Sequence, residues 1–168
     1  MLTPRTIASR PSLTVFLAEP ILFGVWSAVA SRQEDLVACM ASALPQAKAL
    51  KRCALIVAFH RSTPLPGADV RAVVQAEMKK MDPYLVCGAT VLSQEGLAGT
   101  AMRAVTSTLQ LLSRPTHPEK IVASGKEAAV FVHGVLAKLH PPAPSIEEIL
   151  AAYEQVTKQT WSVTFPKA

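Results

Sequence analysis

Two apolar segments decide the fold: CALIVAF at Cys53–Phe59 and YLVCGATVL at residues 84–92. An unbroken apolar run of strand length, bounded by polar turns, is typical of a strand that is covered on both faces. Such strands occur in parallel sheets, whose neighbouring strands are joined by crossover helices. Between the two segments, residues 68–81 carry apolar side chains at helical spacing. We therefore expect two neighbouring parallel strands in an α/β sheet.

The remaining elements follow outward from this pair. Two β-rich runs flank Glu19-Pro20, which indicates two strands joined by a tight turn. Three serines, each followed three residues later by glutamate, predict capped helix starts at Ser31, Ser124 and Ser145. The expected strands are 13–18, 21–28, 53–59, 84–92 and 120–123, and the expected helices are 31–44 (with Pro45 bending or restarting it), 68–81, 97–113, 124–139 and 145–158. The order is β-β-α-β-α-β-α-β-α, with the last helix and a strand at 161–165 appended.

The chain has 168 residues, the ordinary size of one domain. We expect a flexible N-terminal tail over residues 1–12, because it is rich in prolines, hydroxyl residues and cations. The α/β domain then spans residues 13–140. Residues 141–168 read as a Pro-rich linker with a helix and strand extension. That terminal strand would either pack on the core or pair with a second copy, so a homodimer through the extension is one expectation.

Composition excludes several classes of function. Half of the residues are hydrophobic and the formal net charge is +5, but no run of five like charges occurs and aromatic residues are few. We therefore expect no nucleic-acid partner. Cys39, Cys53 and Cys87 form no CxxC pair and the histidines are scattered. The cysteines are typical of buried thiols in a reducing compartment, and no metal site or cofactor is expected.

The N-terminal region poses one alternative. Arg5 and Arg10 precede a mostly apolar stretch that ends in Ala28-Val29-Ala30, a pattern similar to a signal peptide. However, Glu19-Pro20 places a charge and a helix breaker inside that stretch. The interruption favours two short strands over a signal core or a membrane span. We therefore expect a cytoplasmic protein with no membrane association.

The element order, together with LQLLSRP at residues 109–115 and KIV at 120–122, resembles the STAS domains. This is the fold of bacterial anti-sigma-factor antagonists, and the likeness is strongest to their divergent, uncharacterised SpoIIAA-like relatives. It covers about residues 13–139. The resemblance implies a SpoIIAA-like α/β sheet with packed helices and a non-catalytic signalling or scaffold role. Such a module acts by protein–protein interaction, with an anti-sigma factor or a kinase-like regulator as the partner.

In STAS domains of that kind, the loop after the third strand carries an Asp-Ser-Ser-Gly-type motif that a partner kinase phosphorylates. The added negative charge then releases the partner. The corresponding loop here is HRSTPLPG at residues 60–67, which lacks the acidic residue and the Ser-Gly pair. The resemblance implies Ser62 and Thr63 as regulatory phosphorylation sites in a degenerate loop. The alternative is a turn whose hydroxyls cap backbone groups.

Polar residues follow each of the later strands. Because ligands bind outside the carboxyl ends of parallel strands, these loops form the expected interaction or ligand surface. Arg103, one turn into the helix that follows the second segment, could clamp an acidic partner or pair with Glu95. The expected surface consists of His60, Arg61, Ser93, Glu95, Arg103, Ser124 and Lys126.

The segment SQEGLAG at residues 93–99 resembles a phosphate-binding turn only in part. It has two glycines where the dinucleotide fingerprint needs three, it lacks the Gly-Lys-Ser/Thr of a P-loop, and Glu95 would repel phosphate. We instead expect Gly96 to permit a tight turn and Gly99 to allow close packing in the first helical turn.

No catalytic set is evident, so we expect no enzyme. Ser62 lies near His60, but no acidic residue is suggested to orient the histidine, as a hydrolase would need. The leading hypothesis is the protein-interaction module. The alternative is a small-molecule or lipid-like ligand-binding domain, which an apolar pocket of a few hundred Å³ near His60, Ser93 and Ser124 would favour.

Overall fold

The computed structural model describes residues 1–139 and 141–163. Six strands form one mixed sheet in the order β1-β2-β3-β4-β5-β6, with β1, β2 and β3 antiparallel and β3 to β6 parallel. The strands are β1 (Arg5–Ser9), β2 (Leu13–Ala18), β3 (Ile21–Trp26), β4 (Cys53–Phe59), β5 (Leu85–Val91) and β6 (Glu119–Val122). The helices are α1 (Gln33–Leu50), α2 (Ala68–Met81), the short 3-10 helix η1 (Asp82–Tyr84), α3 (Gly96–Ser113), α4 (Gly125–Leu139) and α5 (Ile146–Trp161).

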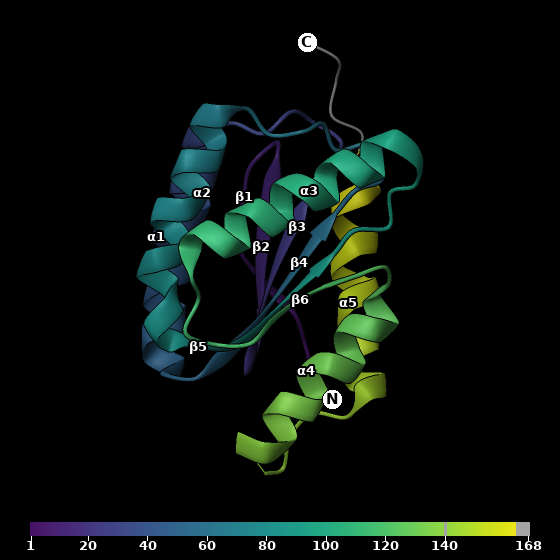
Figure 1. Ribbon diagram of the computed structural model, residues 1–168. Helices are drawn as coiled ribbons and strands as arrows, with labels where there is room; N and C mark the ends of the chain where they lie inside the picture. The colour runs from purple at the N-terminus through teal and green to yellow at the C-terminus, as the bar shows by residue number, and fades with distance from the viewer. Residues whose placement is uncertain (140, 164–168) are drawn as a thin grey trace.

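Helices cover both faces of the sheet. Helices α1, α2 and α3 lie on one side, whereas α4 and α5 lie on the other (Figure 1). Alternate residues of each strand point to opposite faces, and this alternation divides the interior into two apolar cores. In β3, for example, Phe23 belongs to the core beneath α4 and α5, whereas Leu22 belongs to the core beneath α1. The chain is therefore an α/β protein with three layers.

The parallel pairing of the two deciding segments is confirmed. Strand β4 pairs in parallel with β5, with Ala54 opposite Cys87 and Val57 opposite Thr90. Strand β4 pairs on its other side with β3, and β5 pairs with β6. Both segments are thus interior strands, which explains why their sequences are apolar on both faces.

The N-terminal tail was predicted wrongly over part of its length. Residues 5–9 form β1, an edge strand antiparallel to β2 in which Ile7 and Ala8 are half-buried. An edge strand pairs on one side only, so it tolerates the polar and charged residues that suggested a loose segment.

The predicted cap at Ser31 was also wrong. Helix α1 begins after Arg32 without a side-chain cap, and it continues through Pro45 to Leu50. The capping box at Ser145 is confirmed, because its hydroxyl accepts from Glu148 N and Glu148 accepts from Ser145 N.

Helix α5, which lies in the expected C-terminal extension, packs on the core. Ile149 and Val156 of α5 are fully buried in the core beneath α4 and α5. Trp161 was expected to begin a strand, but it is the last residue of α5, and its indole nitrogen donates to the carbonyl of Trp26 at 3.0 Å. The rest of the predicted strand falls partly on residues 164–168, which lie outside the described residues.

The turn into α3 is built as the glycines suggested. Gly96 has φ +67°, a left-handed conformation that favours glycine. A Cβ atom on Gly99 would lie 2.1 Å from the carbonyl oxygen of Gln94, so no larger residue fits there unless the backbone moves. The expectation that this segment serves to turn a corner is therefore confirmed.

Candidate functional site

The loops at the carboxyl ends of β4 and β5 are tied together by one buried amide. Gln94 Nε2 donates to the carbonyl oxygens of His60 and Thr63, each at 3.1 Å. Its Oε1 is buried and has no hydrogen-bond donor among the described residues. Two of the loops expected to meet are therefore joined, through a residue that the predicted surface did not include.

Arg103 also serves this junction. Its guanidinium donates to the carbonyl of Gln94 at 3.0 Å and reaches that of Leu92 at 3.5 Å. Among the described residues, no ion pair joins it to Glu95, the partner that the sequence suggested. Arg103 thus fixes the start of α3 to the end of β5.

The hydroxyls of the degenerate loop differ in exposure. Ser62 is exposed, and its backbone N–H donates to His60 Nδ1 at 3.1 Å. Thr63 is buried, and its hydroxyl donates to the carbonyl of Ser27 at 2.8 Å. A kinase could reach Ser62 on the folded protein, whereas it could reach Thr63 only if the loop opened.

His60 packs edge-on against Trp161, with ring centroids 5.5 Å apart. Desolvation, assisted by the charge of Arg61, lowers the pKa of His60. No carboxylate among the described residues is bonded to its ring.

The other predicted residues remain apart from this junction. Ser93 and Glu95 are exposed beside the start of α3, and Lys126 is exposed in the first turn of α4. The hydroxyl of Ser124 is used within its own turn at the start of α4, where it donates to the carboxylate of Glu127 and accepts from the Glu127 backbone N–H. None of His60, Ser93 and Ser124, near which an apolar pocket was expected, lines the apolar cavity described next.

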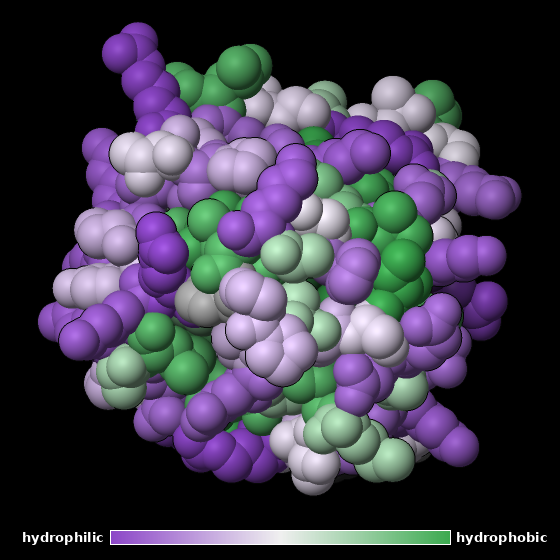
Figure 2. Space-filling view, turned by 90° about the horizontal axis from the view of Figure 1, so that it is seen from below, coloured by the Kyte–Doolittle hydropathy of each residue, from purple (hydrophilic) through white to green (hydrophobic). Residues whose placement is uncertain are grey.

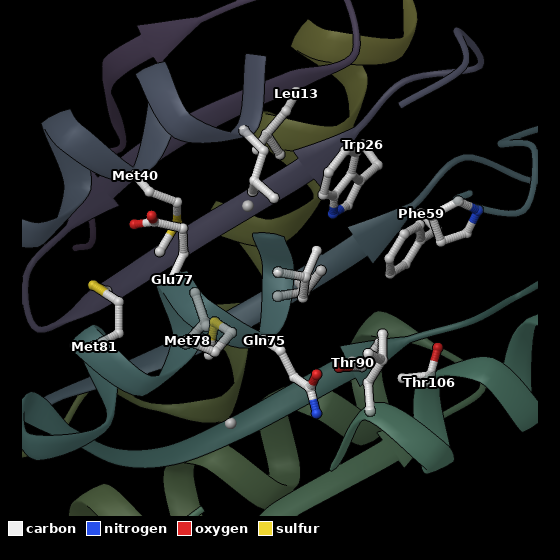
Figure 3. Close-up of a pocket in the computed structure, with 18 of the residues that line it drawn as sticks. Leu13, Trp26, Met40, Phe59, Gln75, Glu77, Met78, Met81, Thr90 and Thr106 are labelled. Atoms are coloured by element: carbon white, nitrogen blue, oxygen red, sulfur yellow. The ribbon is translucent and has the colours of Figure 1, made fainter. Parts of the chain in front are cut away.

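An apolar cavity of about 160 Å³ lies elsewhere, between the sheet and helices α1, α2 and α3 (Figure 3). We call it the α3 cavity. Its floor consists of residues from β2 to β6, and the stacked rings of Trp26 and Phe59 contribute to it from the ends of β3 and β4. The helical lining includes Leu36 and Met40 of α1, Val74 and Met78 of α2, and Met102, Val105 and Leu109 of α3.

Two glycines help to create this space. Gly24 of β3 and Gly88 of β5 both line the cavity. Because glycine has no side chain, neither residue fills the space above it with a side chain of its own. A Cβ atom on Gly24 would meet only ordinary contacts, at 3.9 Å from Val57 and 4.0 Å from Leu13. A glycine inside a strand often marks a place where a ligand approaches the sheet closely. That pattern was present in the sequence, in ILFGVW and VCGATV, and could have identified the cavity floor.

Four methionine side chains line the cavity. The chain contains five methionines, and every one except Met1 lines the α3 cavity: Met40, Met78, Met81 and Met102. Methionine is unbranched and polarizable, so it adapts to different shapes and makes favourable contacts with aromatic rings. The lining is therefore suited to an apolar or aromatic guest.

Helix α3 covers the cavity but is buried over little of its own length. Only Gly99 and Met102 are buried among its residues, although the helix extends from Gly96 to Ser113. Its apolar side chains are largely exposed at both ends, with Leu97 at 90 % and Leu111 at 77 %. Few buried contacts mean a low cost of local displacement, so α3 is the wall through which a guest could enter.

Ionisable groups gather in a corner beside the cavity, where a second, smaller hollow shares Met78, Ser113 and Glu119 with its lining. His117 lies between two carboxylates, with Nδ1 2.9 Å from Asp82 Oδ1 and Nε2 3.2 Å from Glu119 Oε1. Partial desolvation opposes ionisation of Asp82, but hydrogen bonds from the backbone and hydroxyl of Thr116, with the adjacent His117, lower its pKa overall. This corner ties the loop before β6 to the end of α2.

We also looked for a continuous apolar patch on the face of the molecule that is drawn in Figure 2. Figure 2 shows that hydrophobic side chains reach that face in several places but are interrupted by hydrophilic ones. A continuous apolar docking surface is therefore not evident on that face.

Comparisons with protein-family models, with curated proteins and with solved structures found no match. Within the described part of the chain, no helix has both the length and the apolar character needed to cross a membrane. Nor do three or more His, Cys, Asp or Glu side chains gather there in a way that could hold a metal ion.

Proposed function

We propose that this protein binds a small apolar molecule in the α3 cavity. The observation that carries the proposal is an apolar space of about 160 Å³ beside the core, lined by four methionines and floored by two glycines. An engineered apolar cavity of about 150 Å³ binds benzene, so a guest of that size matches the volume of this space. A larger guest would require α3 to move outward.

The apolar lining also favours binding energetically. A guest in this space would remove apolar surface of both the guest and the lining from water, at roughly 25 cal/mol per Å².

The test is a titration of the protein, labelled with ¹³C at its methionine methyl groups, with toluene. We expect shifts at Met40, Met78, Met81 and Met102, whereas exposed Met1 serves as an internal control and should not move. If the methyl signals of these four methionines remain unchanged up to the solubility limit of toluene, the proposed function is refuted.

A second candidate function is protein–protein interaction, as the resemblance to STAS domains implies. The exposed leucines of α3 and the exposed Arg61 and Ser62 favour it. Under this hypothesis the partner is an anti-sigma factor or a kinase-like regulator, and phosphorylation of Ser62 controls its release. A homodimer remains a further prediction, although Trp161 is already used within the chain.

The second candidate is tested by affinity capture with the wild-type chain and with Ser62→Glu, followed by mass spectrometry. Loss of a reproducible partner in the variant would support the switch, and an identical partner list for both chains would exclude it. Thr63→Glu is not a suitable mimic because the buried hydroxyl is part of the loop structure.

A further inference from the structure

The ionisable lining of the α3 cavity is exclusively acidic. Among the residues that line it, Glu77 and Glu119 are the only ones with ionisable acidic or basic side chains, and no Lys, Arg or His is present. This contrasts with the chain as a whole, whose net charge is +5. A guest with a polar end would therefore meet carboxylates inside an otherwise apolar space.

Glu119 is the better placed of the two carboxylates. It begins β6 and pairs with Gly88, so that its side chain lies over the glycine on the cavity face of the sheet. A Cβ atom at position 88 would lie 3.4 Å from its Oε1, an ordinary van der Waals contact, so the carboxylate packs directly over this glycine. The Glu119 side chain is 15 % exposed.

The hydrogen bonding of Glu119 is incomplete. Its Oε1 contacts His117 Nε2, but no hydrogen bond among the described residues engages Oε2. His117 also contacts Asp82, so one imidazole is shared between two carboxylates. Lys79 adjoins the same corner.

Glu77 is already neutralised by a neighbour. Its Oε1 lies 2.7 Å from Lys80 Nζ, one turn further along α2. A guest cation would have to compete with this lysine, whose own side chain is mostly exposed. Glu77 therefore provides a matched control, because it is a carboxylate of the same lining with its charge satisfied.

We propose that the α3 cavity selects small apolar amines, with the ammonium group of the guest directed to Glu119. This rests on the proposed function, because it specifies which apolar molecules bind. A carboxylate-bearing guest of the same size would place like charges together in a poorly solvated space, which is strongly unfavourable. A cation would exchange its lost hydration for an ion pair with Glu119 and a hydrogen bond to it.

The experiment compares three guests of similar size: toluene, benzylammonium and benzoate. Affinities are measured by the methionine-methyl titration and by calorimetry at neutral pH. We expect benzylammonium to bind at least ~10-fold more tightly than benzoate, since opposite and like charges at contact distance differ by more than this factor at an effective dielectric constant of about 20. Toluene binding measures the apolar contribution alone.

Two variants assign the selectivity to one residue. Glu119→Gln keeps the shape and an acceptor for His117 and should reduce the benzylammonium-to-benzoate ratio to near one, with toluene binding retained. Glu77→Gln should leave most of the ratio intact. Toluene binding in both variants also verifies that they are folded.

The outcomes separate the two proposals. If toluene binds but benzylammonium has no advantage over benzoate, amine selection is wrong and the proposed function stands. If the advantage exists but survives Glu119→Gln, the assignment to Glu119 is wrong. If none of the three guests binds, the proposed function itself fails.

Discussion

Filling the α3 cavity from its floor should stabilise the unliganded protein. In Gly24→Val, the new Cβ meets only ordinary contacts and the two methyl groups project from the sheet into the empty space. Three added carbons at about 0.8 kcal/mol per buried methylene give about 2.4 kcal/mol. Replacing a strand glycine adds roughly 0.5–1 kcal/mol, and ordering the valine side chain offsets part of the sum.

Because burial estimates of this kind are upper bounds, we expect a net gain of about 2 kcal/mol. For a chain of this length that corresponds to a rise in Tm of about 4–8 °C. Urea and thermal unfolding, followed by circular dichroism without ligand, measure the gain. The same variant should lose the toluene-dependent shifts of the methionine methyl groups.

The control is Gly134→Ala on α4, an exposed glycine with nothing within 4 Å of the added Cβ. It should gain up to about 1 kcal/mol from helix propensity and bind toluene normally. A Gly24→Val protein that is less stable than wild type, or that binds toluene equally well, would contradict the cavity described here.

The remaining predictions concern other parts of the chain. Gly99→Ala should destabilise the protein by about 2–4 kcal/mol in urea unfolding, because its Cβ would lie 2.1 Å from the Gln94 carbonyl and the start of α3 must shift; wild-type stability would show that this approach is not tight. The folded pKa of Asp82 is lower than its ordinary value of 3.8, so its contribution to stability is present above pH 3.8 and is lost as the pH falls through the folded value. Asp82→Asn should therefore flatten the acid limb of the stability–pH curve below about pH 4, and an unchanged limb would contradict this linkage. Burial raises the pKa of Cys39 and Cys53 to about 11 each and that of Cys87 to about 12. All three thiols should resist alkylation at pH 8 until the protein is unfolded, whereas rapid labelling of the folded chain would show that a core opens readily.

Local patterns were sufficient for most of the secondary structure. The bounds of β4 and α2 agree with the predicted ranges, because apolar continuity and helical spacing depend on neighbouring residues. Where local signals were weak or ambiguous, prediction failed. Edge strand β1 contains Arg5 and Ser9, and its sequence is typical of a loop. Helix α1 begins after Arg32 and not at the cap expected at Ser31.

The expected interaction surface was likewise predicted in part and missed in part. The sequence indicated that the loops after β4 and β5 would meet, since parallel neighbours end at one edge of a sheet. It did not indicate that Gln94 and Arg103 would fasten those loops through backbone carbonyls. Such bonds depend on side-chain reach across residues distant in the chain, which no local pattern records.

By itself, the sequence determined that this chain is an α/β protein with interior parallel strands, and that Gly96 and Gly99 turn the corner into α3. Only the tertiary structure decided where the chain leaves empty space. Strand pairing brings Gly24 and Gly88 to one face of the sheet, and α3 spans the gap without filling it. Whether a volume is filled depends on side chains from several elements at once, so packing decided the location of the cavity and the placement of Glu119 beside it.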